Sequence, residues 1–222
     1  MNPSNPLRSI APTVEADVLQ VLAQTHAPLT GITVERLAGR SHAQVRAVLH
    51  RLSAEGLVDA TRVGNAVQYV LNRDHVLADA VVSIVAAAGT IENRLSMFVE
   101  GSGTPPVSVV MFGFFVRGEG DSESDVDVLM IRSDAVDPYD APWGELRADM
   151  AQHIERWSGN RCQVVELSVS EIRDAYAQDE PLTLSLLAEG RTVFGTPLKA
   201  LLDGAGKSRA TTLIAAAERS VH

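Results

Sequence analysis

The 222-residue chain is predicted to adopt an α/β (α+β) fold, with a helical N-terminal region and a C-terminal region of strands and helices. Three observations predict it. Apolar residues recur with helical spacing over residues 14–54, a Gly-Asn turn separates two strand-like runs within residues 57–71, and short β-branched runs follow residue 105. A hydrophobic content of 45% with 21% charged residues is typical of globular proteins and argues against disorder.

The first predicted helices belong to a helix-turn-helix arrangement. Val14–Gln24 has apolar residues at helical spacing, and Thr13 can act as its N-cap. A short helix over Val34–Ala38, capped by Thr33, is expected to end at Gly39, a residue that readily adopts the left-handed conformation found after helices. A second helix follows. Ser41 is its expected N-cap, Val45, Val48, Leu49 and Leu52 form its apolar face, and Gly56 ends it.

A β-hairpin is predicted directly after these helices, with strands over Leu57–Val63 and Ala66–Leu71 joined by Gly64 and Asn65. The order of helix, helix-turn-helix and hairpin over residues 12–73 resembles the winged-helix domain. The stretch SHAQVRAVLHRLSAEGLVDATRVGNAVQYVLN looks like the version found in bacterial transcription regulators. We therefore assign residues 1–75 to a winged helix-turn-helix domain.

This resemblance implies DNA as a partner, because the second helix of such a unit can enter the major groove. The side chains expected to face DNA are Ser41, His42, Gln44, Arg46 and Arg51 on that helix, and Arg62 on the wing. A winged helix used only for dimerisation or protein contact is the alternative, because residues 1–75 hold seven Arg against six acidic residues.

Residues 76–104 are predicted to form a linker helix. The helical pattern runs from Asn72 to about Glu100, with a break or kink expected at Gly89, and the stretch Gly101–Pro106 is polar and linker-like. A long helix beside a winged helix can join two copies into a homodimer, or it can cap the next domain.

Two strands with a glycine-containing turn between them carry the most informative pattern. Val107–Phe112 and Asp125–Ile131 are the strands, and Asp125 and Asp127 project from the same face about 6.6 Å apart at ~3.3 Å per residue. Two neighbouring carboxylates in an apolar strand are costly without a counter-ion. Mg²⁺ is suitable, because it binds through one or two carboxylates together with phosphate oxygens.

The run from Gly113 to Ile131 resembles the signature of the minimal nucleotidyltransferases of the DNA polymerase beta superfamily. The matching residues are Gly113, Arg117, Gly118, Ser124, Asp125 and Asp127. Residues 157–172 resemble the family's third strand, and residues 186–195 resemble its closing helix and strand. We assign residues 105–222 to this nucleotidyltransferase-like domain. The resemblance implies a small mixed sheet with helices against one face and the nucleotide site on the other.

The resemblance also implies roles for these residues. Asp125 and Asp127 would hold Mg²⁺, and Gly113 would let backbone amides approach phosphate. Arg117 would orient the loop or meet phosphate, and Ser124 would support the turn or donate to phosphate. The implied reaction transfers a nucleoside monophosphate from an NTP, with ATP favoured, to a hydroxyl on a protein, a tRNA or a small molecule. Some family members belong to toxin–antitoxin pairs.

Two positions depart from the family pattern. Phe114 replaces the serine whose hydroxyl contacts phosphate, and Gln163 stands where a third carboxylate is expected. Glu166 is predicted to lie on the opposite face of its strand, and Asp121 and Glu123 are predicted to face solvent in the loop. Two functions therefore stay open. One is an active transferase; the other is a DNA-binding regulator or antitoxin whose degenerate transferase domain senses nucleotide.

The rest of the sequence constrains location and chemistry. No apolar run approaches the ~20 residues that cross a bilayer, and the N-terminus lacks the apolar segment of a secretory signal. The single cysteine, Cys162, excludes an internal disulfide and a multi-cysteine metal site, and we expect it to be a small buried residue. The net charge is −9, and most of the excess is in residues 76–222, with 22 acidic and 12 basic residues. These features predict a cytoplasmic protein without a membrane partner.

Overall fold

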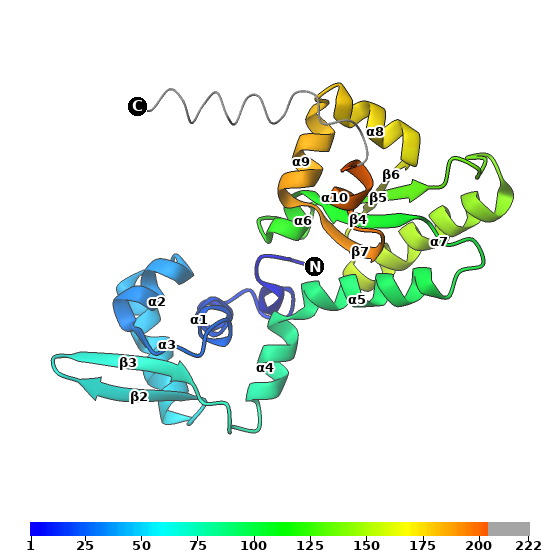
Figure 1. Cartoon of the computed structure of the whole chain (residues 1–222). Coiled ribbons are helices and arrows are strands. Elements are labelled where there is room, and N and C mark those ends of the chain that lie inside the picture. The colour runs from blue at the N-terminus through cyan, green and yellow to red at the C-terminus, as the bar shows by residue number, and fades with distance from the viewer. Residues whose placement is uncertain (204–222) are drawn as a thin grey trace, which may run out of the picture. The chain divides into compact units, whose positions relative to one another are not determined.

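The computed structural model describes residues 1–203 and divides into two compact units (Figure 1). The first comprises Met1–Ile91 and Gly118–Ser124, and the second comprises Glu92–Arg117 and the chain from Asp125 onward. Residues 204–222, the last part of the predicted 105–222 domain, lie outside the described residues. The predicted domain boundaries after residues 75 and 104 stay predictions.

The first unit contains a group of short helices and a small antiparallel sheet with strand order β1-β3-β2. Its elements are the 3₁₀-helix η1 (Pro6–Ser9), α1 (Val14–Ala23), β1 (Leu29–Thr30), α2 (Gly31–Ala38), α3 (His42–Ala54), β2 (Val58–Val63) and β3 (Ala66–Leu71), followed by α4 (Ala78–Val85). This is the helix-turn-helix and wing expected from the sequence. Its core brings together Val18 and Leu22 of α1, Leu49 of α3 and Leu71 of β3, all almost fully buried.

Local signals set most of these boundaries. Gly39 ends α2 with a φ of 63°, and the Ser41 N–H donates to Gln44 Oε1 (3.3 Å) in a capping box at the start of α3. The predicted start of α2 was wrong. This helix begins three residues earlier, because Thr30, and not Thr33, is the N-cap, and its hydroxyl accepts the N–H of Thr33.

The hairpin has the predicted two-residue turn, with Val63 opposite Ala66. Gly64 has a φ of 58°, whereas Asn65 does not have a positive φ. A positive φ at the first turn position alone is typical of a type II′ turn, which suits the right-handed twist of a hairpin.

The linker helix differs from its prediction at two points. It is two helices, α4 and α5 (Ala87–Glu100), and they separate at Ala86 rather than at Gly89, which lies inside α5. Helical structure also starts at Ala78 and not at Asn72. The Asn72 side chain donates to the Gly56 carbonyl (2.8 Å) and accepts from the Asp74 N–H (3.1 Å), which holds this stretch in a turn.

The second unit contains a mixed four-stranded sheet with strand order β6-β5-β4-β7. β4 (Ser108–Phe112) runs antiparallel to β5 (Val126–Arg132) and β7 (Arg191–Gly195), and β5 is parallel to β6 (Cys162–Ser168). The helices are α6 (Gly113–Arg117), α7 (Ala141–Ser158), α8 (Val169–Ala177), α9 (Pro181–Glu189) and α10 (Leu198–Leu202). The predicted mixed sheet is confirmed.

Helices pack on both faces of this sheet (Figure 1). The prediction that helices pack against one face only was therefore wrong. On one face, Val110 and Leu129 pack against Ile172 of α8, Leu186 of α9 and the leucines of α10. α7 lies on the other face and buries Trp143, Met150 and Ile154 completely. The apolar periodicity of both helical regions explains this, because each has a stripe that must be buried.

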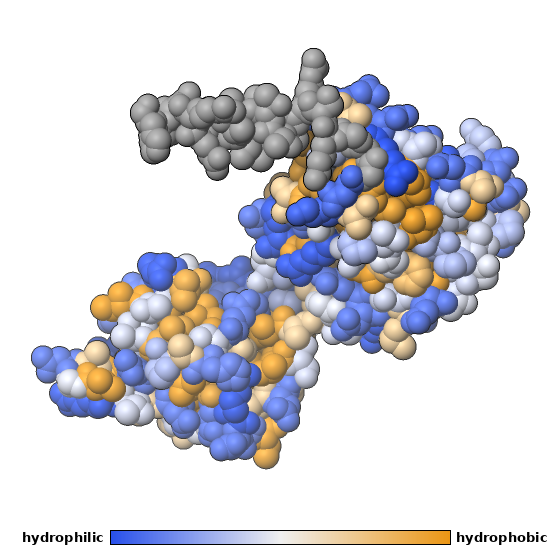
Figure 2. Space-filling model, in the orientation of Figure 1, coloured by the Kyte–Doolittle hydropathy of each residue, from blue (hydrophilic) through white to orange (hydrophobic). Residues whose placement is uncertain are grey.

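Figure 2 shows apolar patches among polar side chains on the visible surface. Large exposed apolar residues of the first unit include Ile32, Leu37, Val63 and Val67. Within residues 1–203, no helix combines the length and apolar content needed to cross a membrane.

Candidate functional site

Asp127 lies against the glycine that ends the first strand of the predicted signature. Asp127 in β5 is opposite Phe112 in β4, and Gly113 follows directly with a φ of 77°. A Cβ at Gly113 would overlap the Asp127 carboxylate, with Cγ only 3.2 Å away. Glycine is therefore required here twice, once for its backbone conformation and once for the space that the carboxylate occupies.

Asp125 and Gln163 complete the polar group around Asp127. Asp125 immediately precedes β5, and the Gln163 side-chain amide donates to Asp125 Oδ2. Gln163 is also the direct neighbour of Asp127 in the parallel pairing of β5 and β6. The strand pairing thus places Gln163 beside both aspartates, in the position where the family pattern led us to expect a third carboxylate.

The electrostatics of Asp127 indicate a site that favours a cation. Burial raises the pKa of the Asp127 carboxyl, the neighbouring Asp125 charge raises it further, and Glu189 adds to this, whereas Arg117 opposes the shift. A divalent cation between the aspartates would remove this penalty. Cys162 is not a candidate nucleophile, because burial, with the nearby carboxylates, raises the pKa of its thiol to about 12.

The donor set is suited to one magnesium ion. Two carboxylates fit Mg²⁺, which takes its other ligands from water and phosphate, and the Gln163 amide oxygen is a further hard donor. Within the described part of the chain, no group of three or more His, Cys, Asp and Glu side chains is placed to hold a metal. The residues present therefore fit a single shared ion better than a pair of ions held by three carboxylates.

Residues 113–117 form a single helical turn rather than the expected open turn, and α9 contacts it. Arg117 forms an ion pair with Glu189, the last residue of α9. The Gly113 backbone N–H also donates to the Glu189 carboxylate, and Ser185 Oγ donates to it at 2.8 Å. Sequence reasoning missed Glu189. The only available signal was its place in the stretch that resembles the family's closing helix and strand.

Phe114 lies at the start of the same helical turn. The residue is 57% exposed, and the Arg117 guanidinium lies over its ring with Cζ 4.5 Å from the centroid. The ring thus packs beside one of the groups expected to meet phosphate and supplies no hydroxyl in place of the family's serine.

The loop after Arg117 is organised by Ser124 and Asp121. Ser124 Oγ accepts the Asp121 N–H (2.9 Å), and Asp121 Oδ1 accepts the Ser124 N–H (3.0 Å). These bonds hold Ser124 within the turn, and its role toward phosphate stays a prediction. Gly118 begins the loop with a φ of 68°.

The other carboxylates named from the sequence are exposed or form ion pairs of their own. Asp121 and Glu123 are exposed, as expected. Glu166 pairs with Arg132 (3.1 Å) and with Arg147 of α7 (2.8 Å), on the opposite face of the sheet. The prediction that Glu166 cannot reach the site from its strand is confirmed, because side chains alternate along a strand.

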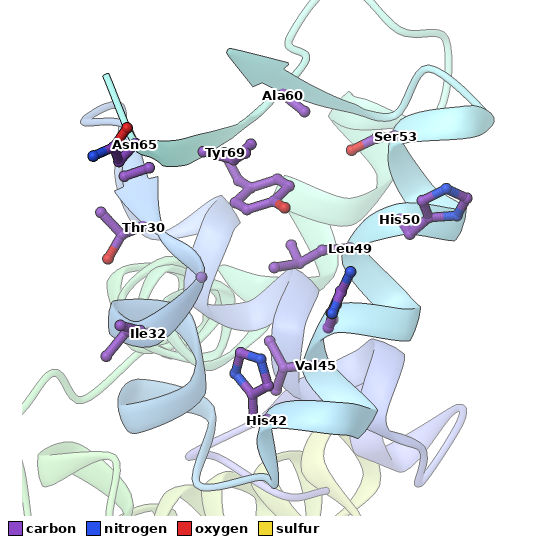
Figure 3. Close-up of a pocket in the computed structure, with 14 residues that line it drawn as sticks. Thr30, Ile32, His42, Val45, Leu49, His50, Ser53, Ala60, Asn65 and Tyr69 are labelled. Carbon is purple, nitrogen blue, oxygen red and sulfur yellow. The ribbon is translucent and has the colours of Figure 1, made fainter. Parts of the chain in front are cut away.

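A second candidate site is a groove of about 600 Å³ between α3 and the hairpin (Figure 3). Three α3 residues spaced four apart, His42, Arg46 and His50, line it because this spacing places them on one helix face. Tyr69 of β3 and Asn65 of the turn line the opposite side. The groove thus combines cationic and titratable side chains with apolar lining residues, which is suitable for an anionic partner.

The predicted DNA-facing residues are distributed unevenly over this surface. His42 and Arg46 line the groove, and His42 Nδ1 is 3.0 Å from Glu35 Oε2. Ser41 and Gln44 bond to each other in the capping box, and their assignment to DNA stays a prediction. Two predicted positions remain: Arg62 lies on the wing with Nε 3.4 Å from the Gly64 carbonyl, and Arg51 pairs with Glu15 and Glu55. His50 lines the groove and was not predicted from the sequence.

Comparison with known proteins gives distant structural likenesses. No protein-family model matches the chain, and a search of curated proteins found no match. A solved toxin–antitoxin structure with AMP-PNP matches 58% of this chain and 92% of its own, at 17% identity and a TM-score of 0.36. A double aspartate-to-glutamate mutant of the MntA–HpeT toxin–antitoxin gives the same values.

The N-terminal region has a separate likeness. A structure described as a predicted DNA-binding transcriptional regulator from Escherichia coli matches 33% of this chain and 74% of its own. The identity is 24% and the TM-score is 0.27. At these scores the functional argument depends on the residues of this chain and not on the likenesses.

Proposed function

We propose that the second unit is a Mg²⁺-dependent nucleotidyltransferase that moves a nucleoside monophosphate from an NTP to a hydroxyl acceptor. The observation that carries this proposal is the packing of Asp127 against Gly113, with Asp125 and Gln163 beside it. The resemblance of residues 113–131 to the nucleotidyltransferase signature supports it, and on the same ground we propose a toxin–antitoxin setting.

Each residue of the group has a chemical task in this proposal. Asp125 and Asp127 would hold the ion, which supplies positive charge to the triphosphate when bound. The Gly113 N–H and the Arg117 guanidinium are donors for phosphate oxygens. Gln163 orients Asp125 through its amide, but it cannot accept a proton from the acceptor hydroxyl, so this chain supplies no carboxylate base at that position.

The direct test is transfer of label from nucleotide to acceptor. The wild-type protein, Mg²⁺ and a cell extract are incubated with each NTP labelled on the α-phosphate, and separately with ATP labelled on the γ-phosphate. We expect α-label on an acceptor, release of pyrophosphate, and loss of both when EDTA removes the metal. Label transferred from the γ-phosphate alone, or transfer that survives EDTA, would contradict the proposal.

A second function rests on the groove of the first unit. We propose that α3 and the wing bind duplex DNA, with His42 and Arg46 facing it and Arg62 of β2 near the DNA backbone. In that case the chain acts as a regulator or antitoxin, and the second unit serves as its nucleotide sensor. DNA binding by the first unit is compatible with nucleotidyl transfer by the second, because the two activities use different units.

Arg46→Ala is expected to weaken binding to the DNA upstream of the gene by about tenfold, since a contacting arginine contributes ~1–3 kcal/mol. Fluorescence anisotropy at low salt, repeated over a salt series, measures both the affinity and the salt dependence. Arg36→Ala, which removes the same charge from α2 outside the groove, is the matched control. Equal affinities for the two variants would exclude the groove as the DNA surface.

A further inference from the structure

Glu189 binds the same groups that the proposed function assigns to the triphosphate. Its Oε2 pairs with Arg117 Nη1, and its carboxylate also accepts the Gly113 N–H. Ser185 Oγ donates to Oε1 from one turn earlier in α9. The side chain is 18% exposed, so these protein contacts take the place of most of its hydration.

A carboxylate in this position resembles a phosphate in its chemistry. Both present oxygen acceptors to a guanidinium and to backbone N–H groups, and such charge-assisted bonds are stronger than neutral ones. The hydrogen bond from Arg117 is the main cause that lowers the pKa of the Glu189 carboxyl, so this group is ionised at neutral pH. Glu189 is therefore an anion at neutral pH, held by the two donors that the proposed function assigns to phosphate.

The backbone directly after Glu189 is packed closely against the sheet. α9 ends at Glu189, and at the following residue, the C-cap Gly190, a Cβ would lie 2.9 Å from Val110 Cγ1 and would overlap the Leu186 carbonyl. The end of the helix is thus packed directly against β4. A rotation of the Glu189 side chain would release Gly113 and Arg117 without displacing the sheet.

We propose that Glu189 is a built-in competitor of the nucleotide, which holds Gly113 and Arg117 in the ligand-free protein and must leave before a triphosphate binds. This inference rests on the proposed nucleotidyltransferase function and deepens it, because it makes nucleotide affinity depend on a carboxylate 72 residues away in the sequence. A binding-competent state that is only fractionally populated lowers the apparent affinity by that fraction. Glu189 thus sets the nucleotide concentration at which the site fills.

The test compares nucleotide affinity in Glu189→Gln and the wild type. Isothermal titration calorimetry with AMP-PNP and Mg²⁺ is expected to give a Kd about tenfold lower for Glu189→Gln, because the neutral amide competes weakly for Arg117. Tripolyphosphate with Mg²⁺ should show the same gain, since the competition concerns phosphate and not the base. Glu180→Gln, at the exposed N-terminus of α9, removes the same charge from the same helix and should leave both Kd values unchanged.

Two further variants protect the test against a folding defect. Ser185→Ala removes a donor to Glu189 from an exposed position and should give a smaller gain in affinity. In the double variant, Arg117→Ala should reduce the gain in nucleotide affinity that Glu189→Gln produces, because both substitutions remove the same ion pair. Thermal melts of each variant show whether it is folded.

The possible outcomes distinguish a failure of this inference from a failure of the proposed nucleotidyltransferase function. Wild-type and Glu189→Gln proteins that bind AMP-PNP equally well, or a Glu189→Gln protein that binds it more weakly, would show that Glu189 is a structural clamp and would overturn the inference alone. Failure of both proteins to bind any nucleotide with Mg²⁺ would remove the proposed function and, with it, this inference. A tenfold gain confined to Glu189→Gln and absent from Glu180→Gln would support both.

Discussion

Asp127→Asn is expected to abolish nucleotidyl transfer, with a rate at least about 10³-fold below that of the wild type. A metal ion supplies several kcal/mol of charge stabilisation to phosphoryl-group chemistry, and each ~1.4 kcal/mol corresponds to tenfold in rate. Asparagine has nearly the shape of aspartate, so it keeps the packing against Gly113 while it removes the charge that would hold the ion. The loss would therefore report chemistry and not a collapsed site.

The measurement is the α-label transfer assay with purified variants whose thermal melts match the wild type. Asp125→Asn should show a loss of similar size, because the two carboxylates share one ion in the proposed site. Asp121→Asn is the matched control, since it makes the same chemical change at an exposed loop residue whose side-chain oxygen can still accept the Ser124 N–H. Wild-type rates in Asp127→Asn would refute the assignment of the aspartates.

Asp17→Ala is expected to destabilise the first unit by about 3 kcal/mol, since removing one partner of a buried ion pair costs ~3–5 kcal/mol. Asp17 is only 5% exposed and accepts from Arg8 Nε and Arg40 Nε, each at 2.6 Å, and from Asn5 Nδ2 at 2.9 Å. These bonds join the N-terminal 3₁₀-helix and the turn between α2 and α3 to α1. The two arginines are about one third exposed, so solvent reduces the penalty toward the lower limit.

Urea unfolding can assign this loss to the correct unit. Both tryptophans of the chain, Trp143 and Trp157, belong to the second unit, so fluorescence follows that unit whereas far-UV circular dichroism follows both. The circular dichroism transition of Asp17→Ala should move to lower urea, and the fluorescence transition should stay in place. Asp59→Ala, at an exposed position of β2, is the control. A shift of the circular dichroism transition no larger than that of Asp59→Ala would show that the bonds to Asp17 contribute little to the stability of the first unit.

The parts of the fold predicted correctly from the sequence have strong local signals. Ser41 with Gln44 fixes the start of α3, and the Gly64-Asn65 pair fixes the hairpin register. The errors occur where local signals compete. Thr30 and Thr33 are both good caps and only one of them is used, and Gly89 is tolerated within a helix while the break occurs at Ala86. Propensity alone cannot decide such cases, because tertiary contacts outweigh differences of ~1 kcal/mol.

For the candidate site, the sequence alone determined the paired aspartates and the glycine beside them, because alternation along a strand and the conformational freedom of glycine are local properties. Only the tertiary structure decided which groups surround them. Gln163 reaches Asp125 through the parallel pairing of β5 and β6, and Glu189 reaches Gly113 and Arg117 through the end of α9. These contacts join residues that are far apart in the chain. They arise from the packing of helices and strands against each other, and a local sequence pattern cannot predict that packing.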